Sequence, residues 1–252
     1  YTLDRFAAGL SQASKMTFQQ STTVPSGFKN SMKVSVASAY TPSSSEWFGF
    51  FQKIEGQNVA DLDFGLSTAK TVTISFWVQS SLTGTFGGAL QNGAFTRSYP
   101  FSYTISAANT WEQKSVTIPG DTSGTWLTTN GIGLLLTFGL GVGSTYSGTA
   151  GSWAAADYRS ATGATSVVGT NGATFYITGV QLEKGSTATS FDYRPYGTEL
   201  ALCQRYYQKS FPQGTAPAQN AGTTGAVYCE SQAASGPAYA YVPWKQTMRA
   251  TP

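Results

Sequence analysis

The chain has 252 residues, enough for one large β domain with a small appendage. Only 11% of the residues are charged while 14% are aromatic, a profile that excludes a disordered chain and favours strands over helices. The formal net charge of +3 is spread thinly, and no apolar run approaches the roughly 18 residues of a membrane span, so neither nucleic-acid binding nor membrane insertion is expected.

Alternating apolar residues predict the strands of the first half of the chain, at residues 6–10, 16–18, 32–36, 47–54 and 71–79. The first two are expected to form an opening pair. The clearest strand is the last one, where Val72, Ile74, Phe76 and Val78 share one face. Trp77 lies on the other face of that strand, among Thr, Ser and Gln residues.

The second half of the chain is predicted to contain strands at residues 84–90, 100–105, 108–118, 132–140 and 175–182. A turn at Asn109 is expected to join the second and third of these as a hairpin, with Trp111 at a bulge or a strand end. The fourth is apolar on both faces, as expected of a central strand. The stretch 139–172 is rich in Gly, Ser and Ala and is predicted as a long loop, and loops of more than about 15 residues are often functional.

The closing strand contains a change of phase. Phe175 and Ile177 alternate, and so do Val180 and Leu182, but the phase slips by one residue at Gly179. A glycine at such a slip indicates a β-bulge, which lets both apolar pairs face one core. Together with turn-bounded strand spacings of roughly 8–12 residues, this predicts an all-β fold, an antiparallel β-sandwich or jelly roll, over residues 1–193.

The remainder of the chain is predicted to have two parts. A linker with a short helix occupies residues 194–209, and a small β region follows at 210–252, with strand candidates at 226–231 and 238–250. Because this region has few apolar positions, it would make a poor core by itself. Three alternatives stay open: it packs on the sandwich, pairs with other protomers, or continues beyond Pro252.

The absence of histidine removes most catalytic chemistry. It excludes Ser-His-Asp and Cys-His catalysis and His-ligated zinc. The glycine-rich run 138–144 lacks the GxGxxG spacing of a dinucleotide site. Cys203 and Cys229 are too few for a disulfide framework and are expected to be reduced, buried thiols, with a pairing between them as the alternative.

A pair of carboxylates is the catalytic route that remains, because glycoside hydrolysis needs only two Asp or Glu side chains, roughly 5 Å or 6.5–9.5 Å apart. The candidates are Asp61 with Asp63, or Glu55 with either. We favour a solvated or turn-capping loop for this segment. A structural calcium ion held by Asp61 and Asp63 with backbone carbonyls is a further alternative, and no other cofactor is expected.

Aromatic residues near polar surfaces are the positive functional signal, because sugar rings stack their C–H faces on Trp and Tyr. The candidates for glycan binding are Trp77, Trp47, Tyr99, Tyr146, Trp153 and Tyr158, together with Arg159 as a hydrogen-bond donor to acidic sugars. For Trp77 the alternative is cover by a neighbouring loop, strand or protomer.

Several motifs resemble known families. FYITGVQLE resembles the last strand of the jelly-roll carbohydrate-binding modules. QLEKGSTATSFDYRPYGTELALCQRYYQK is similar to a phrase of tail-fibre and other structural proteins of tailed bacteriophages and prophages. The same group of phage proteins also contains stretches similar to IEGQNVADL, SSLTGTFGGAL, RSYPFSYTI, GDTSGTW and FGLGVGSTYSGTAG. The resemblance therefore covers most of residues 1–207.

The resemblance implies a virion protein without enzymatic activity, part of a tail fibre or similar appendage and made in the host cytoplasm. The partners that it implies are further copies in a homotrimer, other tail or virion proteins, and host-surface glycans. It also implies that a structural calcium ion is compatible with the fold. Two other functions stay open: a purely architectural module without glycan binding, and a polysaccharide depolymerase that uses the pair Asp61 and Asp63.

Overall fold

A computed structural model describes residues 5–212, 214–226 and 243–250 of the chain. The chain divides into two compact units, Tyr1–Phe191 and Asp192–Pro252. Every described strand lies in the first unit, and the second contains the described α-helix, α1 (Tyr196–Gln204).

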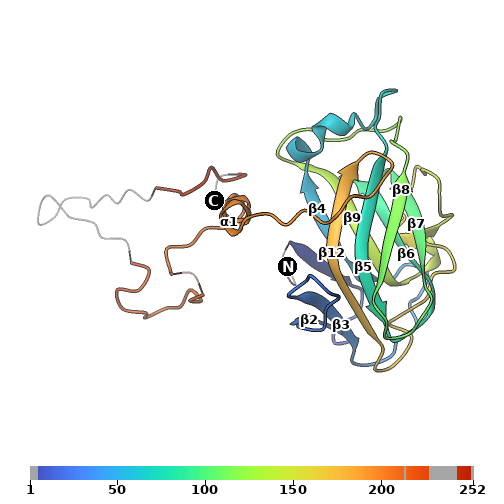
Figure 1. Ribbon diagram of the computed structural model, residues 1–252, viewed down its shortest axis with the longest axis horizontal. Helices are drawn as coiled ribbons and strands as arrows, with labels where there is room; N and C mark the ends of the chain where they lie inside the picture. The colour runs from blue at the N-terminus through green and yellow to red at the C-terminus, as the bar shows by residue number, and fades with distance from the viewer. Residues whose placement is uncertain (1–4, 213, 227–242, 251–252) are drawn as a thin grey trace, which may run out of the picture. The chain divides into compact units, whose positions relative to one another are not determined.

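The first unit consists of two five-stranded antiparallel sheets packed face to face (Figure 1). Sheet A contains, in spatial order, β1 (Phe6–Leu10), β4 (Trp47–Glu55), β9 (Ile132–Val142), β6 (Gly84–Asn92) and β7 (Ser98–Ile105). Sheet B contains β2 (Met16–Ser21), β3 (Ser31–Val36), β12 (Thr174–Lys184), β5 (Val72–Ser80) and β8 (Glu112–Ile118). This architecture confirms the predicted all-β jelly-roll sandwich.

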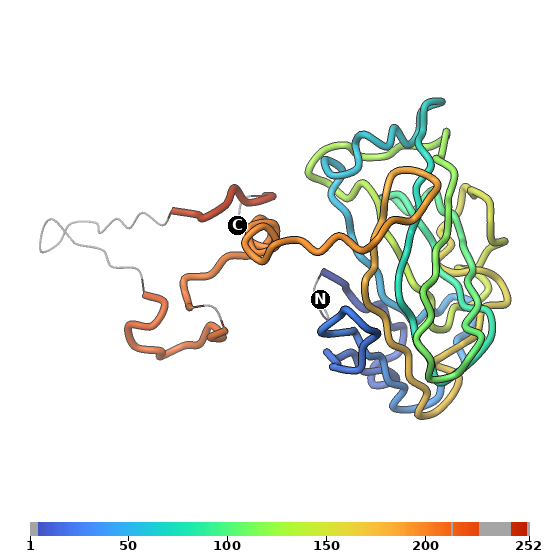
Figure 2. Tube along the Cα trace, viewed as in Figure 1, coloured from blue at the N-terminus to red at the C-terminus, as the bar shows by residue number. Residues whose placement is uncertain are grey.

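Short elements fill the connections. The described residues include three 3-10 turns, η1 (Gly56–Asn58), η2 (Ala60–Leu62) and η3 (Ser144–Tyr146). The segment between β9 and β12, which Figure 2 traces along the chain, contains the short parallel pair β10 (Ser147–Gly148) and β11 (Ser160–Ala161).

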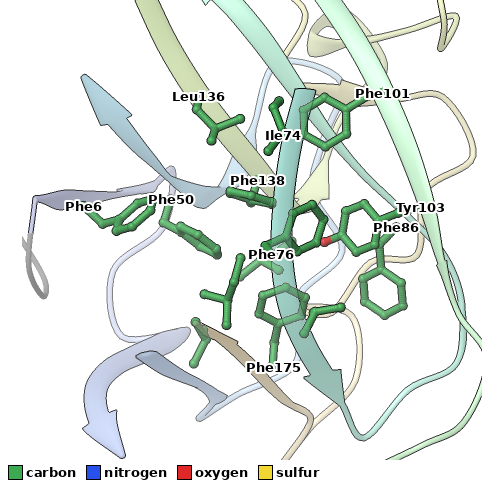
Figure 3. Close-up of a cluster of buried hydrophobic side chains, with 14 of the residues drawn as sticks. Phe6, Phe50, Ile74, Phe76, Phe86, Phe101, Tyr103, Leu136, Phe138 and Phe175 are labelled. Atoms are coloured by element: carbon green, nitrogen blue, oxygen red, sulfur yellow. The ribbon is translucent and has the colours of Figure 1, made fainter. Parts of the chain in front are cut away.

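The core between the sheets contains a connected group of aromatic rings (Figure 3). Phe50 and Phe138 of sheet A stack with their centroids 5.1 Å apart, and Phe76 of sheet B meets Phe138 edge to face at the same distance. Phe175 of sheet B lies 6.0 Å from both Phe50 and Phe86. Rings in such arrangements stabilise the fold beyond the area that they bury, so these aromatic contacts help to hold the two sheets together.

The closing strand β12 has the predicted bulge. Its pairing with β5 shifts register between Thr178 and Gln181, and Gly179 within the shift has a φ of 59°. Phe175 and Ile177 are buried, while Val180 and Leu182 pack against the same core. The strand that ends the sandwich in sequence therefore lies at the centre of sheet B in space.

Three local predictions were wrong. Strands 100–105 and 108–118 do not form a hairpin, because β7 pairs with β6 in sheet A and β8 pairs with β5 in sheet B. The expected opening pair is likewise divided between the sheets, with β1 on β4 and β2 on β3. Alternation shows that a segment is a strand, but it does not show which strand is its partner.

The third error concerns the expected loop 139–172, since residues 139–142 belong to β9. The turn at Asn109 is confirmed, with a φ of 55°, and its N–H donates to Ser80 O at the end of β5. The connection from β7 thereby passes from one sheet to the other. Trp111 directly precedes β8, as expected of a strand end.

The second unit contains the expected short helix, α1, none of whose residues is buried. In the described parts of 210–252 no strand is present. Most of both strand candidates, and Cys229, lie outside the described residues, so the C-terminal β region and the pairing of Cys203 with Cys229 stay predictions. Among the described residues, no helix is long and apolar enough to cross a membrane.

Candidate functional site

A row of glycines crosses the outer face of sheet A. Gly9 of β1 pairs with Gly49 of β4, Gly49 with Gly139 of β9, and Gly139 with Gly87 of β6. Four neighbouring strands therefore present no side chain along one line. The gap is filled from above rather than left open.

Two parts of the chain lie in this gap. A Cβ atom on Gly87 would lie 2.4 Å from Ser160 Oγ, and one on Gly139 would lie 2.7 Å from Ser160 Cβ, so β11 rests directly on the sheet. At the other end of the row, a Cβ atom on Gly9 would lie 2.0 Å from the ring of Trp47. The row thus brings the segment that carries Arg159 down beside Trp47.

Arg159 is the centre of this surface. Its guanidinium carbon lies 4.0 Å from the ring centroid of Tyr146, 4.6 Å from that of Trp47 and 5.8 Å from that of Phe95. The backbone N–H of Arg159 donates to the backbone O of Tyr146 at 2.7 Å, so the two residues lie on neighbouring backbone segments. A guanidinium over aromatic faces is attracted by their quadrupoles. We call Trp47, Phe95, Tyr146, Asp157 and Arg159 the Arg159 cluster.

A chain of hydrogen bonds fixes the guanidinium on its polar side. Arg159 Nε and Nη2 donate to Asp157 Oδ1 at 3.2 Å and Oδ2 at 2.6 Å. Asp157 Oδ1 also accepts from Gln91 Nε2 at 2.8 Å, and Gln91 Oε1 accepts from Thr137 Oγ1 at 2.9 Å. Gln91 and Thr137 are buried in sheet A, so the rigid sheet sets the position of the arginine.

Aromatic and cationic side chains continue along β4. The ring of Phe51 lies 6.1 Å from that of Trp47, and Lys53 Nζ lies 5.7 Å from the centroid of Phe51. This surface offers partly exposed rings for C–H stacking and N–H groups for hydroxyl or carboxylate oxygens. The carboxylate of the Arg159 cluster, Asp157, is occupied by the arginine and by Gln91. The groups that this surface presents to a ligand are therefore aromatic rings and N–H donors.

The structure therefore brings together three of the residues proposed from sequence, Trp47, Tyr146 and Arg159. Tyr158 is next to them in sequence, but its ring lies over Gly148, where a Cβ atom would approach it to 2.2 Å. Its N–H donates to Ser98 Oγ at 3.2 Å. Tyr158 therefore packs against its own segment at Gly148, and its ring contributes less to a ligand-binding surface.

Tyr99 and Trp153 belong to a different aromatic cluster. Their rings lie 5.3 Å apart, and Trp153 also meets Phe64 at 5.8 Å and Trp126 at 5.5 Å. Trp153 Nε1 donates to Pro119 O at 2.7 Å. Tyr99 is only 6% exposed, and this burial raises the pKa of its hydroxyl. Both residues anchor loops against the sandwich, so we leave them out of the proposed site.

Trp77 lies on the outer face of sheet B, apart from the Arg159 cluster. It is half-buried, and it pairs across the strands with Thr178 and Gln113. A Cβ atom on Gly179 would lie 2.6 Å from the ring of Phe28 and 3.5 Å from Trp77 Cδ1, so Phe28 lies close beside it. Cover by a neighbouring loop, the alternative stated from sequence, accounts for this environment.

Asp61 and Asp63 lie in and after the 3-10 turn η2 rather than on a strand. Lys184 Nζ donates to Asp61 Oδ2 at 2.5 Å, and this hydrogen bond lowers the pKa of the Asp61 carboxyl. Asp63 Oδ2 accepts from Thr68 Oγ1 at 3.0 Å. Over the described part of the chain, no group of three or more His, Cys, Asp or Glu side chains could hold a metal ion, so calcium binding stays a prediction without further side-chain ligands.

The residues that the sequence prediction missed are Phe95, Asp157 and the glycine row. The spacing of Asp157 and Arg159, two apart, was a visible signal for an ion pair. The glycine row was not visible, because it depends on strand register. Arg97, an arginine of similar appearance in sequence, forms a buried ion pair with Asp121 through contacts of 2.6 and 2.7 Å.

No protein-family model matches the chain, and no curated protein matches it. Several solved structures are similar to the chain at low identity. One is the enzymatically active domain of bacteriophage CBA120 tailspike protein 4, with a TM-score of 0.42 and 14% identity, covering 71% of this chain and 19% of that one. A putative sugar binding protein from Bacteroides thetaiotaomicron has a TM-score of 0.42 and 13% identity, with coverage of 71% and 87%.

A third is the family 11 carbohydrate-binding module from Clostridium thermocellum, described in complex with a β-1,3-1,4-mixed-linked tetrasaccharide. It has a TM-score of 0.39 and 13% identity, and covers 74% of this chain and 92% of that one. With TM-scores this low, these likenesses say nothing about what this chain binds.

Proposed function

We propose that this chain is a non-catalytic component of a phage virion appendage, such as a tail fibre, that binds host-surface glycans through the Arg159 cluster. The assignment to a virion appendage is supported by the tail-fibre motifs of residues 1–207. The glycan-binding role is supported by one observation, the guanidinium of Arg159 held between aromatic rings on the outer face of sheet A.

The geometry suits sugar recognition because the site is rigid before a ligand arrives. Asp157 and the rings of Trp47 and Tyr146 restrict the Arg159 side chain, so little further conformational entropy is lost on binding. Partly exposed ring surface matches the C–H faces of a pyranose, and N–H groups match its oxygens. In a homotrimer, three weak sites would add up to useful adhesion.

Two half-buried tryptophans provide a matched test. Trp47 lies on the outer face of sheet A and Trp77 on that of sheet B. We expect Trp47→Ala to lower retention on an array of bacterial capsular and O-chain polysaccharides by about tenfold or more, and Trp77→Ala to leave it unchanged. Circular dichroism and thermal unfolding of both variants check that the fold is retained.

Equal retention by the two variants would place the site elsewhere. Absence of retention by the parental chain, with normal incorporation into particles, would support the architectural alternative. Loss of retention by Trp77→Ala alone would move the site to sheet B.

The depolymerase alternative is less well supported by the site. A general acid needs a raised pKa, whereas the ion pair with Lys184 lowers the pKa of Asp61. This alternative predicts that the purified chain shortens host polysaccharide and that Asp61→Asn or Asp63→Asn stops it. Size-exclusion chromatography of the polysaccharide measures the outcome.

A further inference from the structure

Phe95 has a backbone conformation that bulky residues rarely adopt. Its φ is 58°, in the left-handed region. The other described non-glycine residues with a positive φ are short and polar: Ser14, Asp63, Asn109 and Asn220. Such side chains tolerate this conformation, whereas an aromatic residue stores strain in it.

The surrounding hairpin turn maintains the strain. Asn92, fully buried at the end of β6, accepts hydrogen bonds from the N–H groups of Thr96 at 2.9 Å and Arg97 at 3.0 Å. Its Nδ2 donates to Thr96 Oγ1 and to Thr125 O. Phe95 N–H donates to Asn92 O at 3.1 Å. The turn is thus fixed on both sides of Phe95, and the backbone cannot relax without breaking these bonds.

Burial does not compensate for this strain. The Phe95 side chain is 41% exposed, and it is not part of the hydrophobic core. Its ring lies beside the guanidinium of Arg159, 5.8 Å from centroid to carbon. A glycine or asparagine would suit the turn better, so the aromatic ring serves something other than folding.

We infer that Phe95 is the stacking residue that selects the sugar at the Arg159 cluster. This inference rests on the proposed glycan binding. The exposed ring takes the apolar C–H face of a pyranose, and Arg159 donates hydrogen bonds to oxygens of the same sugar. The ligand class is therefore a glycan with a pyranose that has one unbroken C–H face, because an axial hydroxyl on that face would lose its water against the ring.

The test combines binding and stability in the full chain. Phe95→Gly relieves the backbone strain and removes the ring. We expect its Tm to rise by about 2–4 °C and its apparent affinity on the bacterial polysaccharide array to fall by about tenfold. Phe95→Tyr keeps the ring and should retain both the Tm and the affinity of the parental chain.

Asn109→Gly is the matched control, because Asn109 has a φ of 55° and lies in the connection between β7 and β8. It measures the effect of glycine in a left-handed position and should leave array binding unchanged. A Phe95→Gly variant that binds as tightly as the parental chain, while Trp47→Ala does not, overturns this inference and leaves the proposed function standing. A lower Tm for Phe95→Gly also overturns it, because the ring would then be structural. An array that retains no parental chain overturns both.

Discussion

The outer face of sheet A (face A) and the outer face of sheet B (face B) carry similar residues but differ in what lies over them. On sheet B, Tyr176 contacts Trp111 at 6.2 Å and lies under Lys33 at 5.7 Å, with Trp77 on the same face. On sheet A, Trp47 and Tyr146 also meet a cation, but that cation comes from a separate segment that rests on a row of glycines. Aromatic residues and a positive charge are thus common to both faces.

The difference teaches that a cation near an aromatic ring is not by itself a binding site. Lys33 is a neighbour of Tyr176 across the strands, since the two residues are register partners. Arg159 is instead held by Asp157, which is held in turn by Gln91 of the sheet. Face A is distinguished by an added layer that positions its cation, and the following changes compare that layer with other parts of the molecule.

The largest effect is expected from Asp121→Ala. The Arg97–Asp121 pair joins the residue that directly precedes β7 to the loop between β8 and β9, and its side chains are only 16% and 2% exposed. Removing one partner leaves a charge poorly solvated, so the free energy of unfolding should fall by about 3–5 kcal/mol, as measured by urea denaturation.

The matched change is Asp157→Ala in the Arg159–Asp157 pair, whose side chains are 17% and 26% exposed. Because this pair is more open to solvent, stability should fall by about 1 kcal/mol or less, while array binding is lost. Equal destabilisation by the two variants would show that both pairs are structural.

The next effect is expected from Gly87→Val. Its side chain would meet Ser160 and Ala161, so β11 must shift or the strand must bend. We expect a loss of about 1–3 kcal/mol in the free energy of unfolding, together with loss of binding, because Arg159 moves with β11. Gln113→Val, at an exposed position on face B, is the control and should change stability by about 0.5 kcal/mol at most. Normal binding by a folded Gly87→Val variant would contradict the role of the glycine row.

The smallest effect concerns pH. The hydrogen bond from Gln12, with those from Ser43 and Tyr40, lowers the pKa of Glu46 to about 2. A carboxyl whose pKa is lower in the folded state stabilises that state above its ordinary pKa of 4.5, and this contribution is lost as the pH falls from there toward about 2. Glu46 directly precedes Trp47 and accepts hydrogen bonds from Gln12 Nε2 and Ser43 N–H, so acid should weaken these contacts at the edge of face A.

Side-chain carboxyl chemical shifts measured by NMR between pH 2 and 6 would check this prediction. A Glu46 titration near its ordinary pKa would contradict it. Glu46→Gln, which cannot titrate, should remove the corresponding pH dependence of the Tm.

Much of the fold could be predicted because alternation depends only on local sequence. The inward row Val72, Ile74, Phe76 and Val78 is fully buried as expected, and the slip at Gly179 is a bulge. Strand pairing was less predictable. The division of β7 and β8 between the sheets depends on where β5 and β6 lie, which no window around Asn109 contains.

The site was predicted in part. Trp47, Tyr146 and Arg159 were proposed from residue type, yet the same criterion also selected Tyr99 and Trp153, which pack in a loop-anchoring cluster, and Trp77 on the opposite sheet. Phe95 was missed because its exceptional property is a backbone angle. Residue type indicates which chemistry is available, but not which residues share a surface.

By itself, the sequence determined that this protein is an all-β sandwich with no histidine chemistry, because periodicity and composition can be read without knowing which residues meet in space. Only the tertiary structure decided which aromatic residues meet. Gly9, Gly49, Gly139 and Gly87 are far apart in the chain and become one row through strand register alone. That row lets a segment between two strands lie on the sheet, and the contact places Arg159 against Trp47.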